Sequence, residues 1–275
     1  MNTTTMNLQS HAVLPELETP RAVVSGSTET SRTQILQVRD LSVSFDGFKA
    51  VDGLSFGVDQ CELRVVIGPN GAGKTTLLDM ICGKTRPSSG QILFDGHDVT
   101  RLSEDRIVKL GIGRKFQTPS VYEDLTVSEN LEISLPQGQG VLSSLFFKRD
   151  AKAREAIESA AREVFLLDAL DHKAGQLSHG QKQWLEIGML LTQQPQLLLL
   201  DEPVAGMSPR EREQTAELLQ RISSGKSVIV IEHDMDFVKR IAHKVTVLHQ
   251  GRLLSEGSVA QVQADPRVID VYLGH

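Results

Sequence analysis

The sequence predicts an α/β fold with a parallel core sheet, an antiparallel β subdomain and an inserted helical subdomain. Two observations carry this expectation. A glycine-rich loop at residues 68–76 lies between a short apolar strand and a helix, and a second apolar strand at residues 197–200 ends in two acids. After residue 177, strand and helix patterns alternate, which is typical of a parallel sheet whose strands are joined by helices.

The first part of the chain is mainly of strand type. Alternating apolar and polar side chains, or short apolar runs, predict strands over residues 35–45, 54–58, 63–67 and 91–94. The turns Asp46-Gly47 and Asp95-Gly96 separate elements of this region. The glycine loop then leads into a helix at residues 74–82.

Residues 104–176 differ from this pattern and are mostly helical, which predicts the inserted helical subdomain. Within them, apolar side chains recur at helical spacing over residues 148–167. Beyond the insert, the pattern predicts helices over residues 180–192, 210–222 and 235–241, strands over 197–200 and 227–231, a hairpin over 245–255 and a helix ending near Tyr272.

Composition limits the function further. Residues 1–33 are rich in Thr, Ser, Glu and Pro and are expected to be a disordered tail, which leaves residues 34–275 as the folded domain. The formal net charge of −6 disfavours a nucleic-acid partner. No apolar run approaches the length of a membrane span, so we expect a cytoplasmic protein that reaches a membrane through a partner. Cys61 and Cys82 show no metal spacing and are expected to be reduced core thiols.

The glycine loop matches the phosphate-loop pattern of a glycine, four residues and then Gly-Lys-Thr. Its residues are Gly68-Pro69-Asn70-Gly71-Ala72-Gly73-Lys74-Thr75-Thr76. The glycines let successive backbone N–H groups face inward, where they and the start of the next helix bind phosphate oxygens. Lys74 can reach the β- and γ-phosphates, and Thr75 can offer its hydroxyl to Mg²⁺. These residues predict a site for the phosphates of a nucleotide.

The strand at residues 197–200 runs into Asp201-Glu202-Pro203. Two carboxylates at a buried strand end are costly unless a cation is present, and Mg²⁺ is the cation that accompanies ATP. Asp201 is therefore the expected metal ligand. Glu202 is the candidate base that polarises the attacking water.

Leu177-Ser178-His179-Gly180-Gln181, taken with these two motifs, resembles the signature segment of the ATP-binding-cassette (ABC) ATPases, a type of P-loop NTPase. The resemblance implies that Ser178, Gly180 and Gln181 bind nucleotide held by a second protomer, so that two chains close on ATP. His179 departs from the commoner glycine. An ordinary serine-capped helix is the alternative for this segment alone.

The same resemblance implies further site residues. Gln117 matches the glutamine that senses Mg²⁺ and the attacking water, and His233 matches the histidine that contacts the γ-phosphate. Phe45 matches the aromatic residue that stacks on adenine, with Phe48 as a competitor and core packing as an alternative for either.

Val204-Ala205-Gly206-Met207-Ser208-Pro209 departs from the common cassette pattern, which carries Asp where Ser208 stands. It resembles the branched-chain amino-acid and urea uptake group. Residues 177–190 and the ending Val271-Tyr272-Leu273-Gly274 look close to the ATP-binding subunit of urea importers. The resemblance implies an ATPase at the inner face of the cell membrane that powers import, with urea as the expected solute and branched-chain amino acids as the alternative.

The partners implied are transmembrane permease subunits, a second ATP-binding subunit (a sister subunit or a second copy) and, indirectly, a periplasmic solute-binding protein. The surface that meets the permease is expected to include residues 118–130, with residues 141–147 as a further candidate. A soluble cassette ATPase not tied to transport, and an export ATPase, are the remaining alternatives. Long coiled-coil heptads and a second cassette, which DNA-repair and translation members carry, are absent from the sequence.

Overall fold

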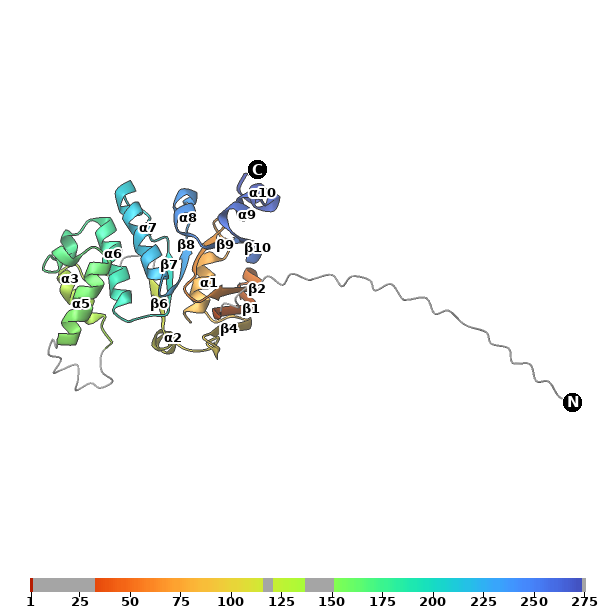
Figure 1. The fold of residues 1–275 in the computed structure, drawn as a ribbon, viewed down its shortest axis with the longest axis horizontal. Coiled ribbons are helices and arrows are strands. Elements are labelled where there is room, and N and C mark those ends of the chain that lie inside the picture. Colours follow the sequence, from red (N-terminus) through yellow and green to blue (C-terminus); the bar gives the residue numbers. More distant parts are fainter. Residues whose placement is uncertain (2–32, 116–120, 137–150, 274–275) are drawn as a thin grey trace. The chain divides into compact units, whose positions relative to one another are not determined.

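The computed structural model describes Met1 and residues 33–115, 121–136 and 151–273. The chain divides into two units, Met1–Ser31 and Arg32–His275. The described helices and strands belong to the second unit (Figure 1). The tail expected at residues 1–33 therefore lies almost wholly outside the described residues.

The larger sheet, as far as the structure describes it, has six strands in the order β10-β9-β3-β8-β7-β6. Its strands are β3 (Leu63–Ile67), β6 (Ile112–Lys115), β7 (Leu197–Asp201), β8 (Ser227–Ile231), β9 (Lys244–His249) and β10 (Arg252–Gly257). The pairs from β9 to β6 are parallel, and β10 joins β9 as an antiparallel edge strand. The expected parallel core sheet is confirmed.

Strand β6 differs from the sequence expectation, which assigned residues 104–176 to a mainly helical region. Its four residues, Ile-Gly-Arg-Lys, do not read as a buried strand because two are charged. Both charges are buried with acidic partners, Arg114 at 2.5 Å from Asp79 and Lys115 at 3.4 Å from Glu186. Ion pairs to residues distant in the sequence thus allow a strand that the local pattern does not predict.

The smaller sheet is antiparallel and confirms the expected β subdomain. Its order is β2-β1-β4-β5, with β1 (Gln34–Phe45), β2 (Phe48–Asp59), β4 (Ser89–Phe94) and β5 (His97–Asp98). Strand β2 begins directly after the Asp46-Gly47 turn and is longer than the expected run at residues 54–58. Residues 48–53 escape the alternating pattern because the β1–β2 register shifts there and Gly53 has a φ of 66°.

The helices cover both faces of the core sheet. Their bounds are α1 (Lys74–Ile81), α2 (Glu104–Leu110), α3 (Val127–Ile133), α5 (Ala151–Glu163), α6 (His179–Leu191), α7 (Pro209–Ser223), α8 (Met235–Ile241), α9 (Val259–Ala264) and α10 (Pro266–Leu273), with short 3₁₀ turns at Leu167–Ala169 and Ala174–Gln176. No helix among these described segments is long and apolar enough to cross a membrane.

Two hydrophobic clusters follow from the alternation of side chains along the core strands. On β3, Val65 belongs to the cluster formed with α5, α6, α7 and α8, whereas Val66 belongs to the cluster formed with α1 and the antiparallel sheet. The helices α3, α5 and α6 contact one another and lie together at one end of the unit (Figure 1). Strand β3 is thus covered on both faces, which fixes the loop that follows it.

The two cysteines behave differently from each other. Cys82 is buried, as expected, but Cys61 is exposed, which corrects the expectation of two core thiols. The reason is local: Cys61 lies between β2 and β3 with a φ of 55°, in a turn that leads its side chain away from the core.

Arg64 is the buried charge that joins the two sheets. Its side chain is fully buried in β3 and donates to Gly57 O of β2 at 2.7 Å and to Glu256 Oε1 of β10 at 2.8 Å. It also donates to Glu62 Oε1 at 2.5 Å and Thr246 Oγ1 at 2.8 Å. A guanidinium whose hydrogens meet acceptors in both sheets holds their relative position.

We expect Arg64→Ala to destabilise the chain by about 3–5 kcal/mol, because the buried Glu62 carboxylate loses its cation. Urea unfolding of the full-length protein, followed by circular dichroism, measures this change. Arg240→Ala is the matched control, since its ion pair with Glu213 is exposed at both ends; it should change the free energy of unfolding by less than about 1 kcal/mol. Equal effects of the two substitutions would contradict the role given to Arg64.

Candidate functional site

The phosphate loop joins the end of β3 to the start of α1 and is shaped by glycines. Gly68 and Gly73 have φ angles of 154° and 96°. A Cβ on Gly68 would lie 2.2 Å from Leu248 O, and one on Gly73 would lie 2.4 Å from Ala50 O. These close approaches explain why side chains are excluded at both positions.

The backbone amides at the start of α1 are free for a ligand. The N-cap of α1 is Gly73, and no side chain caps the helix there. The loop is held in place from outside, because Gly251 N donates to Ala72 O at 3.1 Å and Asp52 N donates to Gly251 O at 2.9 Å. An uncapped and well-anchored helix N-terminus is a site for anions such as phosphate.

Lys74 points back over this loop. Its Nζ donates to Gly68 O at 2.8 Å and to Pro69 O at 3.0 Å. Burial lowers the pKa of the Lys74 ammonium, while the carboxylates of Glu202 and Asp201 act in the opposite direction. The predicted phosphate loop and the predicted acids therefore lie in one electrostatic neighbourhood.

Asp201 ends β7 and is almost completely buried, at 2% exposure. Both of its carboxylate oxygens are buried and lack a hydrogen-bond partner among the described residues. Burial raises the pKa of this carboxyl, and Thr75 and Arg114 counteract that effect only in part. A buried carboxylate with two free oxygens beside the first turn of α1 suits a divalent cation.

Glu202 follows at the strand end and is partly exposed. Its backbone has a φ of 46°, which is strained for a residue other than glycine, and its amide donates to Ile231 O at 3.0 Å. Its Oε1 lies 3.5 Å from Nδ1 of His233. The structure thus brings together Lys74, Asp201, Glu202 and His233, as the sequence predicted.

His233 lies in the short segment between β8 and α8, and acidic residues on either side hold this segment. Glu232 Oε2 accepts from His233 N at 3.1 Å, and Asp234 caps α8 by accepting from the amides of Asp236 and Phe237. The second oxygen of Asp234 accepts from Arg212 of α7 at 2.6 Å. The backbone that carries His233 is therefore anchored to two elements.

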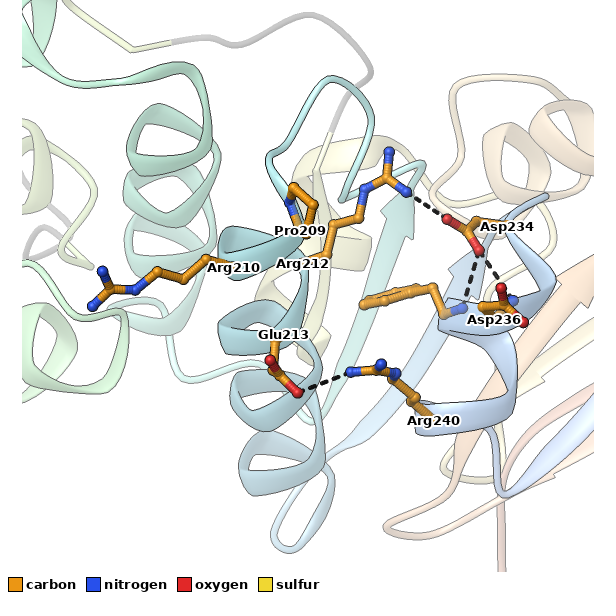
Figure 2. A pocket seen from close by; sticks show the side chains of 8 residues that line it. Pro209, Arg210, Arg212, Glu213, Asp234, Asp236 and Arg240 are labelled. Carbon is orange, nitrogen blue, oxygen red and sulfur yellow. Dashed lines mark hydrogen bonds and ion pairs between the residues drawn. The ribbon is translucent and has the colours of Figure 1, made fainter.

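A hollow lined by charged side chains lies between α7 and α8 beside this segment (Figure 2). Two ion pairs link the helices around it, Arg212 with Asp234 and Arg240 with Glu213. No residue of the phosphate loop lines the hollow. The hollow is therefore separate from the predicted phosphate site.

The signature residues form a second cluster at the start of α6. Ser178 is the N-cap, and Ser178 and Gln181 form a reciprocal capping box. A Cβ on Gly180 would lie 2.4 Å from Oε1 of Glu211, so a side chain here would displace the Glu211 carboxylate. The serine-capped helix start weighed as an alternative is thus present, and the same geometry exposes the Ser178 side chain.

Three predicted features have different outcomes. Phe45 and Phe48 face each other across the β1–β2 turn and are 48% and 65% exposed, so core packing is wrong for both. Gln117 and the surface candidate at residues 141–147 lie outside the described residues. Of the expected permease surface at residues 118–130, residues 118–120 also lie outside the described residues, and Tyr122 is 54% exposed.

The structure adds two acids that the sequence analysis missed. Glu211 accepts from Ser178 Oγ and from Ser208 Oγ, each at 2.8 Å. The Ser-x-x-Glu pattern at residues 208–211 could have identified Glu211 as part of a capping box. Glu232 has no comparable signal, because its burial depends on the packing of β8 against the phosphate-loop strand.

Comparisons with known proteins agree with this geometry. The family model described as ABC transporter matches residues 51–205, and the model described as branched-chain amino acid ATP-binding cassette transporter matches residues 252–275. The chain is 36% identical over 251 residues to the high-affinity branched-chain amino acid transport ATP-binding protein BraF of Pseudomonas aeruginosa, covering 87% of this chain and 98% of BraF. It is 33% identical to the protein of the same description, LivG, of Escherichia coli K12, with the same coverage of each chain.

Solved structures give the same result for the fold. The crystal structure of a nucleotide-free ATP-binding cassette from an ABC transporter matches with a TM-score of 0.77 and 33% identity, covering 88% of this chain and all of that one. The ADP conformation of MJ1267, an ATP-binding cassette of an ABC transporter, matches with a TM-score of 0.78 and 32% identity over 88% of this chain and 100% of that chain.

The buried Glu232 gives a pH prediction. Burial raises the pKa of its carboxyl above the ordinary glutamate value, although the amides of His233 and Asp234 oppose this. The folded chain therefore holds this proton to higher pH than the unfolded chain. The contribution of Glu232 to stability is fully present below the unfolded pKa and is lost as the pH rises through the folded pKa.

Consequently, Glu232→Gln should remove this pH dependence, and its free energy of unfolding should rise relative to wild type as the pH increases above the ordinary glutamate pKa. Urea unfolding at several pH values in metal-free buffer measures the difference. Glu213→Gln, at an exposed site on α7, is the control. A Glu232→Gln curve parallel to that of wild type would contradict the assignment.

Proposed function

The chain belongs to the ATP-binding cassettes of ABC transporters, which are ATPases that bind ATP, and we propose that it powers an importer of branched-chain amino acids. The observation that carries the chemistry is the juxtaposition of the phosphate loop, Asp201, Glu202 and His233 at one edge of the parallel sheet. The proposed solute is supported by sequence similarity to relatives named for branched-chain amino acid transport.

The phosphate loop binds the phosphates of ATP. Backbone N–H groups of the loop, other than at Pro69 and Ala72, and of the uncapped start of α1 donate to phosphate oxygens. Lys74 exchanges its two carbonyl partners for the β- and γ-phosphates. Phe45, which is exposed beside the first turn of the antiparallel sheet, stacks on the adenine. All nine loop positions named in the sequence analysis belong to this cradle.

Asp201 and Thr75 would hold Mg²⁺, with Gln117 as the third expected ligand. The free, buried oxygens of Asp201 fit a cation that prefers oxygen ligands. When bound, the ion neutralises charge that develops on the phosphates. Asp201 thereby gains a counter-charge that Arg114 supplies only in part.

Glu202 acts as the general base. Its carboxylate accepts a proton from the water that attacks the γ-phosphorus, the new P–O bond forms, and the bond to the β-phosphate oxygen breaks to leave ADP. His233, 3.5 Å from Glu202, contacts the γ-phosphate and holds the carboxylate in place. The strained backbone of Glu202 fixes the direction of this side chain.

The signature residues Ser178, Gly180 and Gln181 act on a second nucleotide. Within the described residues, the hydroxyl of Ser178 bonds to Gln181 and Glu211, and no hydrogen bond of Ser178 goes to the phosphate loop. A partner protomer, either a second copy or a sister subunit, therefore presents its ATP to this surface. Closure of two chains on two ATP molecules is the step that ATP binding drives and hydrolysis reverses.

The remaining partners follow from this role. The chain works at the cytoplasmic face of the cell membrane with transmembrane permease subunits, which receive solute from a periplasmic binding protein. The exposed Tyr122 and its neighbours meet the permease, and Glu123 of this surface pairs with Lys182 of α6 at 2.6 Å. Motion of the signature helix is thereby passed to the docking surface.

Glu202→Gln should retain ATP binding, reduce turnover by about 10²–10⁴-fold and accumulate an ATP-bound dimer. Steady-state phosphate release and size-exclusion chromatography with ATP, in the presence of any sister subunit, measure both effects. Glu213→Gln is the control with an exposed carboxylate and should match wild type. Wild-type turnover in Glu202→Gln would show that another group is the base.

The solute is tested by uptake. Deletion of the gene should abolish uptake of labelled leucine at low concentration, and the wild-type gene but not Glu202→Gln should restore it. Urea is the solute expected from residues 177–190 and 271–274, but the relatives do not support it. Uptake of labelled urea is therefore measured in the same deletion strain. Loss of urea uptake alone would replace the amino-acid proposal; loss of neither would contradict the importer role.

A further inference from the structure

Two loops of the same chain are tied together beside the nucleotide sites. The signature loop, residues 177–181, precedes and begins α6. The post-acid loop, residues 203–208, joins Glu202 to α7. Under the proposed function, the first loop touches the nucleotide of the partner protomer and the second begins at the base for this chain's own nucleotide.

Glu211 forms the first link between these loops. One carboxylate oxygen accepts from Ser178 Oγ at 2.8 Å, and the other accepts from Ser208 Oγ at 2.8 Å and Ser208 N at 2.9 Å. These hydrogen bonds lower the pKa of the Glu211 carboxyl, so it bridges the loops as an anion at neutral pH. This link uses the signature serine itself.

His179 forms the second link, at the residue that departs from the commoner glycine. Its Nε2 lies 3.1 Å from Ala205 O. Because a carbonyl oxygen only accepts, this contact is a hydrogen bond in the tautomer that carries the hydrogen on Nε2. The same Nε2 also lies 3.4 Å from Nε2 of Gln183, one turn further along α6. The ring also rests on the backbone of Gly206, where an added Cβ would lie 3.3 Å from the ring, and the φ of 72° there already excludes most side chains.

The link at Ala205 leads directly to the base. Ala205 N donates to Glu202 O at 3.2 Å, which closes a turn on the strained residue. Ala205 is therefore bonded on its N–H side to Glu202 and on its C=O side to His179. A glycine at position 179 has no side chain with which to make the second bond.

We propose that His179 is a positioning residue that couples the two ATP sites, by holding through Ala205 the turn that orients Glu202. The inference rests on the proposed function, since it requires a partner's nucleotide at the signature loop. Binding of that nucleotide moves the N-terminus of α6, and the bond from His179 carries the displacement to the turn at Glu202. Hydrolysis at one site then depends on occupancy of the other.

His179→Ala and His179→Gln test this coupling in the full-length chain, with the sister subunit where one is needed. His97→Ala is the matched control, because His97 also contacts a backbone carbonyl, Asp95 O at 2.9 Å, but on the antiparallel sheet. In His179→Ala, ATP affinity should stay within about twofold of wild type, since the phosphate loop is intact. The kcat should fall by about tenfold, as expected for the loss of one positioned hydrogen bond.

Two further readouts separate positioning from general stability. The Hill coefficient for ATP should fall toward one in His179→Ala, and His179→Gln, whose amide can donate to the same carbonyl, should recover part of both kcat and cooperativity. Amide hydrogen exchange of residues 204–207 in the nucleotide-free chain should accelerate in His179→Ala and stay unchanged in His97→Ala.

Unchanged amide exchange at residues 204–207 in His179→Ala would overturn the link itself. Faster exchange with wild-type kcat and Hill coefficient would overturn the coupling role, because the bond would then serve only the fold of the loop. A wild-type chain that hydrolyses no ATP would instead contradict the proposed function. The exchange experiment contains no nucleotide, so these failures are distinguishable.

Discussion

The parallel register of β3, β8 and β7 is the constraint on which the site depends. Val66 of β3 and Asp201 of β7 both lie opposite Ile231 of β8, so the three strands end at the same edge. The backbone continues this alignment beyond the strands, because Glu202 N donates to Ile231 O and Glu232 N donates to Val66 O. The ends of β3 and β7 are about 130 positions apart in the sequence, and those of β7 and β8 about 30, yet the parallel register brings all three to the same edge of the sheet.

Charge is balanced differently in the framework and in the site. Arg64, Arg114 and Lys115 are buried with acidic partners, which makes each of them a fixed connection between elements. Asp201 and Glu232 are buried, and both oxygens of Asp201 but only Oε1 of Glu232 lack a hydrogen-bond partner among the described residues. Burial raises the pKa of both carboxyls. The buried cations between the elements thus have partners of opposite charge. The buried carboxyls at the edge of the sheet where nucleotide is proposed to bind instead need a bound cation or a proton to offset the cost of their burial.

The sequence predicted those parts that local pattern determines. Leu197–Asp201 is an uninterrupted apolar strand with an acid at its end, and the phosphate loop has glycines at the positions where the backbone approaches Leu248 O and Ala50 O. Strand β6 could not be predicted, because Arg114 and Lys115 are buried only through partners on α1 and α6. The burial of Glu232 likewise depends on packing between strands. Glu211 was predictable in principle as the end of a Ser-x-x-Glu cap, but its bond to Ser178 was not.

Helix α6 connects the elements that must move together if the chain powers transport. Ser178, Lys182 and Glu186 follow one another at intervals of four residues, so they lie along one side of the helix. Ser178 caps the helix where the partner's nucleotide is proposed to bind, Lys182 pairs with Glu123 of the proposed docking surface, and Glu186 pairs with Lys115 at the end of β6. A displacement at the first position is expected to reach the other two, because a continuous helix moves as one body. Solute identity enters only through the docking partner, so cassettes with the same nucleotide chemistry can serve transporters for different solutes.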